Sequence, residues 1–260
     1  MDVVADGYDA VYAAWPTSPT LQGIWAREAR GSNYPEGFEH ISFLTLGEMR
    51  RIAAELQLAP GQRVLDVACG AGGPGLWVAQ ENRATLLGVD LSRVGVRLAA
   101  RCASDRRVVA ADFMIAAASA VGLADGSVDG ALSIDALQYV PDKRAALGEV
   151  ARMLSRGSRF VFTAFELDPE RVAGLPVLGI DPVSDYAPVL HETGFDVVTY
   201  EETSDWQRRL DATFGAVVAA QDILAAEMSE QAIAALLMEA SLTLELQPYR
   251  RRVLVVASRN

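Results

Sequence analysis

The chain has 260 residues, 51% of them hydrophobic, and a formal charge of −11, a composition that supports a packed core and excludes a disordered chain. The scarcity of clustered cations argues against a nucleic-acid partner, and no apolar run approaches the roughly 20 residues that a membrane span needs. No signal-peptide pattern stands at the start, and with only two cysteines we expect a cytoplasmic enzyme.

Residues 1–58 have a helical pattern that prolines interrupt, because Pro16, Pro19 and Pro35 cannot continue a helix. This aromatic-rich segment is expected to cover a cofactor-binding core at 59–205. In that core we expect strands at 63–68, 85–90, 107–111, 128–134, 159–165 and 195–201, with helices at 73–80, 92–103 and 142–154. Residues 206–246 are expected to form two long helices, with Ser229 as a cap, and 247–260 contain a last strand at 252–258.

Strands that alternate with helices are typical of a parallel sheet with helices on both faces. The prediction is therefore an α/β fold: a doubly wound, seven-stranded Rossmann-like sheet in a single domain that spans residues 1–260. The N-terminal and C-terminal helices are expected to act as lid elements over the strand ends. Packing against an edge of the sheet is the alternative for 206–246.

The strongest local signal is an apolar strand that runs into glycines and then directly into a helix. Gly70, Gly72 and Gly75 match the G-x-G-x-x-G pattern, and Pro74 suits the first turn of the helix. Such a loop exposes backbone N–H groups to a ligand. The pattern alone also fits nicotinamide dehydrogenases, so the residues around the loop must indicate which cofactor it binds.

Three aspartates are expected to end three successive strands near this loop. Asp66 would repel an anionic pyrophosphate but attract the amino group and sulfonium of S-adenosylmethionine. Asp90 can accept hydrogen bonds from both ribose hydroxyls. Asp112 can accept one from the adenine amino group, with Leu91 or Phe113 on the ring face. Helix capping and turn formation are the alternative roles of each aspartate.

The segment 64–72 resembles the first motif of class I S-adenosylmethionine-dependent methyltransferases. Residues 133–142 resemble the loop after their fourth strand. In the ubiquinone/menaquinone-type small-molecule branch that loop often carries His-His or Gln-His, where this chain has Gln138 and Tyr139. Residues 153–158 are similar to the family's leucine-x-proline-glycine-glycine turn, with departures at Arg156 and Ser158. The resemblance covers roughly residues 60–165.

The resemblance implies S-adenosylmethionine as the cofactor, with the methionine part beside the glycine loop, the ribose at Asp90 and the adenine at Asp112. The expected cofactor-binding residues are Asp66, Ala68, Gly70, Gly72, Asp90, Leu91, Asp112, Phe113, Ile134 and Gln138. No metal is expected, because no cluster of ligands has metal-binding spacing.

Methyl transfer requires alignment of nucleophile, methyl and sulfur, and in some cases a base. His40, Asp135 and Tyr139 are the candidate catalytic residues. His40 stands among aromatic residues ahead of the core, where it can either deprotonate a hydroxyl or cap the helix that follows. His191 lies at a helix end, where a structural role is expected.

The predicted function is methyl transfer to a small, largely apolar molecule, at oxygen, nitrogen or carbon, in bacterial secondary metabolism. The alternative is a cyclase or decarboxylase that binds S-adenosylmethionine without transferring its methyl group. A dehydrogenase is disfavoured by Asp66, and a non-catalytic subunit by the intact glycine loop. A small molecule is the expected partner, and a homodimer is left open.

Overall fold

The computed structural model describes residues 3–108, 110–177 and 182–260. Within them lies a seven-stranded sheet with the strand order β3-β2-β1-β4-β5-β7-β6. The strands are β1 (Arg63–Val67), β2 (Thr85–Asp90), β3 (Ala111–Ile115), β4 (Val128–Ile134), β5 (Leu154–Leu167), β6 (Phe195–Glu202) and β7 (Arg250–Arg259). Strands β1 to β5 pair in parallel, and β7 runs antiparallel between β5 and β6. The predicted doubly wound sheet is confirmed.

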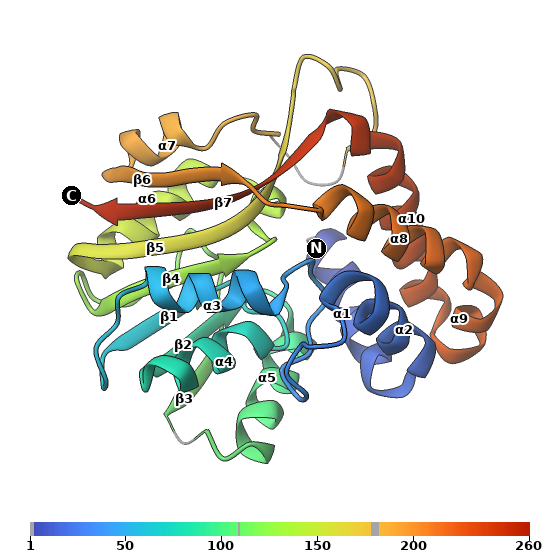
Figure 1. Ribbon diagram of the computed structural model, residues 1–260, viewed down its shortest axis with the longest axis horizontal. Helices are drawn as coiled ribbons and strands as arrows, with labels where there is room; N and C mark the ends of the chain where they lie inside the picture. Colours follow the sequence, from blue (N-terminus) through green and yellow to red (C-terminus); the bar gives the residue numbers. More distant parts are fainter. Residues whose placement is uncertain (1–2, 109, 178–181) are drawn as a thin grey trace.

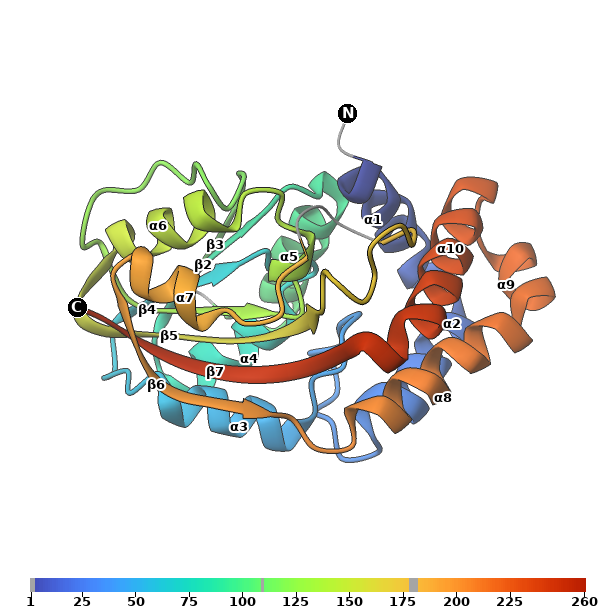
Figure 2. The same cartoon turned by 90° about the horizontal axis from the view of Figure 1, so that it is seen from above.

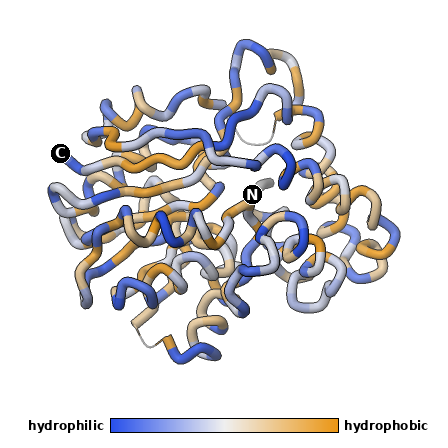
Figure 3. The backbone as a smooth tube through the Cα atoms, in the orientation of Figure 1, coloured by the Kyte–Doolittle hydropathy of each residue, from blue (hydrophilic) through white to orange (hydrophobic). Residues whose placement is uncertain are grey.

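Helices cover both faces of this sheet (Figure 2). One face carries α3 (Leu46–Glu55), α4 (Gly73–Asn82) and α5 (Arg93–Asp105), and the other carries α6 (Lys143–Met153) and α7 (Ala187–Glu192). Strands covered on both sides need apolar residues at successive positions, and in β1 Val64, Leu65 and Val67 are fully buried. Figure 3 shows the resulting hydrophobic centre among the strands.

A second group of helices lies beyond the carboxyl ends of the parallel strands (Figure 1). It consists of α1 (Val3–Ala14), the 3-10 turn η1 (Trp15–Thr17), α2 (Pro19–Ile24), the π-helical turn η2 (Trp25–Arg30), α8 (Trp206–Ala219), α9 (Gln221–Glu227) and α10 (Glu230–Leu246). These helices share one hydrophobic cluster, in which Trp25 meets Phe214, and Phe43 meets Phe165 edge to face at 5.8 Å. The N-terminal segment and the insertion before β7 are therefore one layer.

The structure corrects the start of two strands, the number of helices in one segment and the cap of one helix. The third strand was expected at 107–111 but begins at Ala111, and residue 109 lies outside the described part. The fifth strand begins at Leu154, directly after α6, instead of at residue 159. Residues 206–246 form three helices instead of two, although Ser229 does cap α10. The helix after His40 is capped by Thr45, which makes a capping box with Glu48.

No helix within the described ranges is long and apolar enough to cross a membrane.

Candidate active site

A cavity of about 310 Å³ lies between helix α1 and the carboxyl ends of the parallel strands. Four successive strand ends reach it: Ala68 follows β1, Asp90 ends β2, Ala117 follows β3 and Asp135 follows β4. Ligands of open α/β sheets bind at this edge, where the strand order reverses. The cavity is therefore the candidate ligand site, and its size falls in the usual range for small-molecule pockets.

The glycine loop has the conformation that its sequence predicts. Gly70 and Gly72 have φ values of 52° and 80°, and Gly72 is the N-cap of α4. A Cβ added at Gly75 would overlap the Asp66 carboxylate, and one at Gly70 would overlap the Tyr12 hydroxyl. The glycines thus let a carboxylate and a phenol approach the backbone closely.

Asp90 is fixed at the end of β2 by the backbone. Its Oδ2 accepts a hydrogen bond from Gly70 N at 2.7 Å, and its Oδ1 accepts one from Ser92 N at 2.7 Å. Burial raises the pKa of Asp90, while those two N–H donors oppose the shift. The carboxylate lines the cavity and keeps lone pairs for further donors.

Asp66 lies deeper, only 2% exposed, beside the first turn of α4. Burial and the nearby Asp90 raise the pKa of its carboxyl well above the usual value. A buried pair of acids at one helix terminus is stabilised by a cation or by donors from a ligand.

A second, smaller cavity of about 40 Å³ lies against the glycine loop. It is lined by Asp66, Gly70 and His40, and it shares Tyr12 and Ala68 with the large cavity. The Tyr12 side chain from α1 therefore stands at the boundary between the two cavities. Because its hydroxyl lies against Gly70, Tyr12 covers the loop backbone.

His40 is buried in the wall of this smaller cavity, 7% exposed. Its Nδ1 is 2.7 Å from the Ser42 hydroxyl, and its Nε2 has no hydrogen-bond partner among the described residues. Burial, and then the charges of Arg30 and Arg252, hold the pKa of His40 well below the usual imidazole value. In the neutral tautomer whose Nδ1 accepts from the Ser42 hydroxyl, the ring presents an N–H donor at Nε2.

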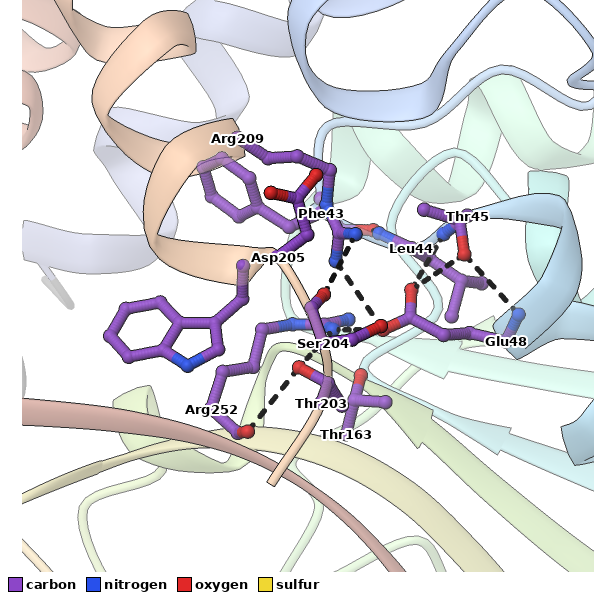
Figure 4. A network of polar contacts seen from close by, with 12 residues as sticks. Phe43, Leu44, Thr45, Glu48, Thr163, Thr203, Ser204, Asp205, Arg209 and Arg252 are labelled. Atoms are coloured by element: carbon purple, nitrogen blue, oxygen red, sulfur yellow. Dashed lines mark hydrogen bonds and ion pairs between the residues drawn. The ribbon is translucent and has the colours of Figure 1, made fainter. Parts of the chain in front are cut away.

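Asp135, a candidate base, forms an ion pair with Arg252. Its Oδ1 accepts from Arg252 Nε at 2.9 Å, and its Oδ2 accepts from Arg252 Nη2 at 3.2 Å and from Phe43 N at 2.9 Å. Arg252 is fully buried and also donates a hydrogen bond to Glu48 Oε1 at 2.6 Å. Arg209 donates to the same oxygen at 3.4 Å (Figure 4). We call these residues, Arg252, Asp135, Glu48 and Arg209, the Arg252 network.

The Arg252 network joins β7, the loop after β4, α3 and α8. Asp135 has a φ of 49°, and Ala68, which follows the neighbouring strand β1, has a φ of 59°. Such strained residues persist only where their surroundings hold them in place, and they cluster at functional sites. The Arg252 network holds the backbone that lines the cavity.

Gln138 and Tyr139 follow in the short helical turn η3 (Leu137–Tyr139). The Gln138 side chain makes two hydrogen bonds to the backbone: it donates to Asp135 O at 2.5 Å and accepts from Phe165 N at 3.3 Å. It does not line either of the two cavities. Tyr139 does line the large cavity, and its hydroxyl donates to Glu239 Oε1 at 2.9 Å.

The prediction that Asp112 ends the third strand is wrong. Asp112 is the second residue of β3 and pairs with Leu87, whereas Asp90 pairs with Ile115 at the other end of the strand. Asp112 lines neither cavity. The Phe113 ring instead packs against Gly88 of β2, where it would block a Cβ, and it lies 3.2 Å from where a Cβ at Gly72 would stand. The wall where adenine was expected consists of Ala116, Ala117, Ala118 and Ser119, with the exposed Leu91 beside it.

These residues fit S-adenosylmethionine. The unpartnered Nε2 of His40 and the close-approach glycines lie around the small cavity, where the methionine part would be held beside Asp66. Asp90 would hold the ribose, and Leu91 and Ile134 would border the adenosine. When bound, the cofactor supplies an electrophilic methyl group.

Sequence reasoning missed Tyr8, Tyr12 and Glu239. Tyr8 and Tyr12 are four positions apart on α1, a spacing that places two side chains on one helix face. That spacing was the available signal. Glu239 carries no local signal, because its partners lie in other elements.

The sheet order, the glycine loop and the acids around it define a nucleotide-cofactor-binding enzyme of the Rossmann-like class. Comparison with known proteins specifies the class further. Residues 65–162 match the methyltransferase domain family. An O-methyltransferase of Aspergillus nomiae is 32% identical over 181 residues, which cover 66% of this chain and 80% of that protein.

The 27-O-demethylrifamycin SV methyltransferase of Amycolatopsis mediterranei is 28% identical over 225 residues, 79% of this chain and 78% of the relative. Among solved structures, the 4+2 cyclase SpnF superposes with a TM-score of 0.75 at 23% identity, covering 98% of this chain and 95% of that one. Other structures of this fold hold S-adenosylmethionine or S-adenosylhomocysteine. The chain belongs to the S-adenosylmethionine-dependent methyltransferase family.

Proposed function

We propose that this methyltransferase methylates a hydroxyl group on a small, largely apolar molecule. The observation that carries the proposal is the composition of the large cavity. Outside the wall assigned to the adenosine, Ala5, Ile41 and Val140 line it together with the phenols of Tyr8, Tyr12 and Tyr139. Its charged lining residues are Asp90, Asp135 and Asp142. Among the described lining residues there is no lysine or arginine to hold a phosphate or carboxylate on the acceptor.

Two further observations support an oxygen acceptor. The phenols offer neutral hydrogen-bonding partners to a hydroxyl, and such groups fix orientation within an otherwise apolar site. Two relatives are named for O-methylation, one of them of a rifamycin. We therefore place the reaction in natural-product biosynthesis. Cytoplasmic placement agrees with Cys69 and Cys102, which are both free thiols.

The test is a product assay on matched acceptors. The purified enzyme is incubated with S-adenosylmethionine and a panel of apolar phenols and alcohols, each paired with the amine of the same skeleton. Mass spectrometry follows both the methylated product and S-adenosylhomocysteine. We expect ethers to form in step with S-adenosylhomocysteine, and the Asp90→Ala variant serves as a control with impaired cofactor binding.

Methylation confined to amines or carbon atoms would refute the oxygen acceptor. Conversion of an acceptor at unchanged mass, without S-adenosylhomocysteine, would instead identify a cyclase that keeps the methyl group on the cofactor.

A further inference from the structure

Three side chains from distant parts of the chain meet behind the wall of the large cavity. Tyr139 donates a hydrogen bond to Glu239 Oε1 at 2.9 Å, and Tyr8 donates to the same oxygen at 3.1 Å. The two rings stand edge to face with their centroids 5.7 Å apart. Both phenols line the cavity and Glu239 does not. The Glu239 carboxylate is therefore separated from the cavity by the two phenols, and each of them joins it through one hydrogen bond.

The surroundings of Glu239 favour uptake of a proton. Burial raises the pKa of its carboxyl, whereas the hydrogen bonds from Tyr139 and Tyr8 and the charge of Arg250 oppose that shift. Among the described residues Tyr12 also faces it, and its phenol stays protonated because burial raises its pKa well above the usual value. A carboxylate with a raised pKa accepts a proton more readily than an exposed glutamate does.

The other candidate bases are less suited to this task. Both oxygens of Asp135 are bonded to Arg252, and Oδ2 also accepts from Phe43 N. His40 lies in the smaller cavity beside the glycine loop, and burial with two nearby arginines disfavours its protonated form. Tyr139 and Tyr8 both connect the cavity to the Glu239 carboxylate, and Tyr139 makes the shorter hydrogen bond, 2.9 Å against 3.1 Å.

We propose that Glu239 is the terminal proton acceptor of the reaction, and that Tyr139 relays the proton to it from the hydroxyl of the substrate. The proposal rests on the proposed function, because a hydroxyl oxygen must lose its proton when it becomes an ether. Tyr8 is a positioning residue that holds the receiving oxygen of Glu239 in place.

The step balances in atoms and charge. A lone pair of the acceptor oxygen forms the new carbon–oxygen bond, and the pair of the broken carbon–sulfur bond stays on sulfur, which becomes a neutral thioether. The hydroxyl proton passes to Tyr139 Oη, whose own proton passes to Glu239 Oε1. The positive charge of the sulfonium and the negative charge of the carboxylate disappear together.

The experiment uses four variants of the whole chain: Glu239→Gln, Tyr139→Phe, Tyr8→Phe and the control Glu245→Gln. Glu245 is an exposed glutamate of the same helix, α10. Single-turnover rates are measured against pH with a hydroxyl acceptor from the panel, and S-adenosylhomocysteine affinity is measured by calorimetry. Infrared difference spectra between wild type and Glu239→Gln follow the carboxyl through a pH titration without any acceptor.

We expect Glu239→Gln and Tyr139→Phe to lower the single-turnover rate by about 10²–10⁴, the usual contribution of a positioned base. The fall in rate toward low pH should vanish in Glu239→Gln, while cofactor affinity stays within about twofold of wild type. Tyr8→Phe removes a donor that stabilises the carboxylate, so its acid limb should move to higher pH. Glu245→Gln should behave as wild type.

Ether formation by Glu239→Gln at the rate and pH dependence of Glu245→Gln would overturn the proposal while leaving the proposed function intact. Methylation of amines or carbon atoms alone by wild type would defeat the proposed function and, with it, the relay. An infrared titration that gives the carboxyl an ordinary glutamate pKa of about 4.3 would also overturn the relay, whether or not an acceptor is found.

Discussion

Replacing His40 with phenylalanine tests whether this residue binds the cofactor or removes a proton. The substitution deletes both ring nitrogens and keeps a ring against Tyr34, whose centroid lies 4.9 Å from that of His40. Within the described part of the chain, Nε2 is buried without a partner beside the glycine loop. A ligand carboxylate in the small cavity would accept a hydrogen bond from the N–H of His40 Nε2.

The size of the effect follows from that geometry. A buried hydrogen bond to a charged group contributes about 1.5–3 kcal/mol. Its loss corresponds to a roughly ten- to hundredfold weaker binding of S-adenosylhomocysteine. 5′-Methylthioadenosine has no carboxylate, so His40→Phe should leave its affinity unchanged. Because the pKa of His40 is held well below its usual value, the ring is neutral at ordinary assay pH and this contribution should be flat between about pH 6 and 8.

Calorimetry with both ligands measures these affinities, and His191→Phe is the matched control, since His191 is exposed at the end of α7. His40→Gln restores an N–H donor and should recover part of the loss. Equal weakening of both ligands would point to a general disturbance of the site. Unchanged affinity for both, together with a rate lowered by about 10²–10⁴, would refute the cofactor role and restore His40 as the base.

Arg252→Met leaves the buried Asp135 without its counter-charge and leaves Glu48 with Arg209 alone, so we expect a loss of about 3–5 kcal/mol and a melting temperature lower by about 6–20 °C. Adding Asp135→Asn should recover part of that loss, and a calorimetric shift below about 2 °C would contradict this account of the Arg252 network. Asp90→Ala should weaken S-adenosylhomocysteine binding at least about tenfold, since each charge-assisted hydrogen bond to the ribose contributes about 1.5–3 kcal/mol. Asp112→Ala should change that affinity by less than about twofold, because its place in β3 keeps it out of both cavities; a large loss would return it to the site.

The glycine loop and the strands around it were predictable because their signals are local. The expected strand at 85–90 agrees with β2 residue for residue, and the strand at 63–68 agrees with β1 except for its last position. Central strands must be apolar on both faces, which makes them easy to find. The turn at Gly70 and Gly72 needs backbone conformations that glycine provides.

The third strand was misplaced because it lies at the edge of the sheet. Edge strands bury little, and in β3 no residue is fully buried, so its pattern is weak. The run ahead of it looked more apolar, but Arg107 has a φ of 56°, which ends the preceding segment in a turn. Asp112 was assigned to adenine on the basis of that wrong boundary.

The contacts between the cavity wall and the rest of the chain could not be read from the sequence, since they join distant positions. Arg252 and Asp135 are 117 residues apart, and Tyr8 and Glu239 are 231 apart. Polar residues at such positions look like ordinary surface residues until the fold buries them. Only the topology of the sheet and the helical layer brings them together.

The position of β7 also determines when the site can be completed during synthesis. A ribosome makes β7 after β6 and after the helices α8 to α10, yet this strand lies between β5 and β6. Until it emerges, β5 and β6 have no shared partner, and Asp135 and Glu48 lack the guanidinium of Arg252. The residues that line the two cavities lie between positions 5 and 142, yet Asp135 is held in place by Arg252, which is synthesised 117 residues later. The wall of the cavity therefore precedes the contact that fixes it in the order of synthesis.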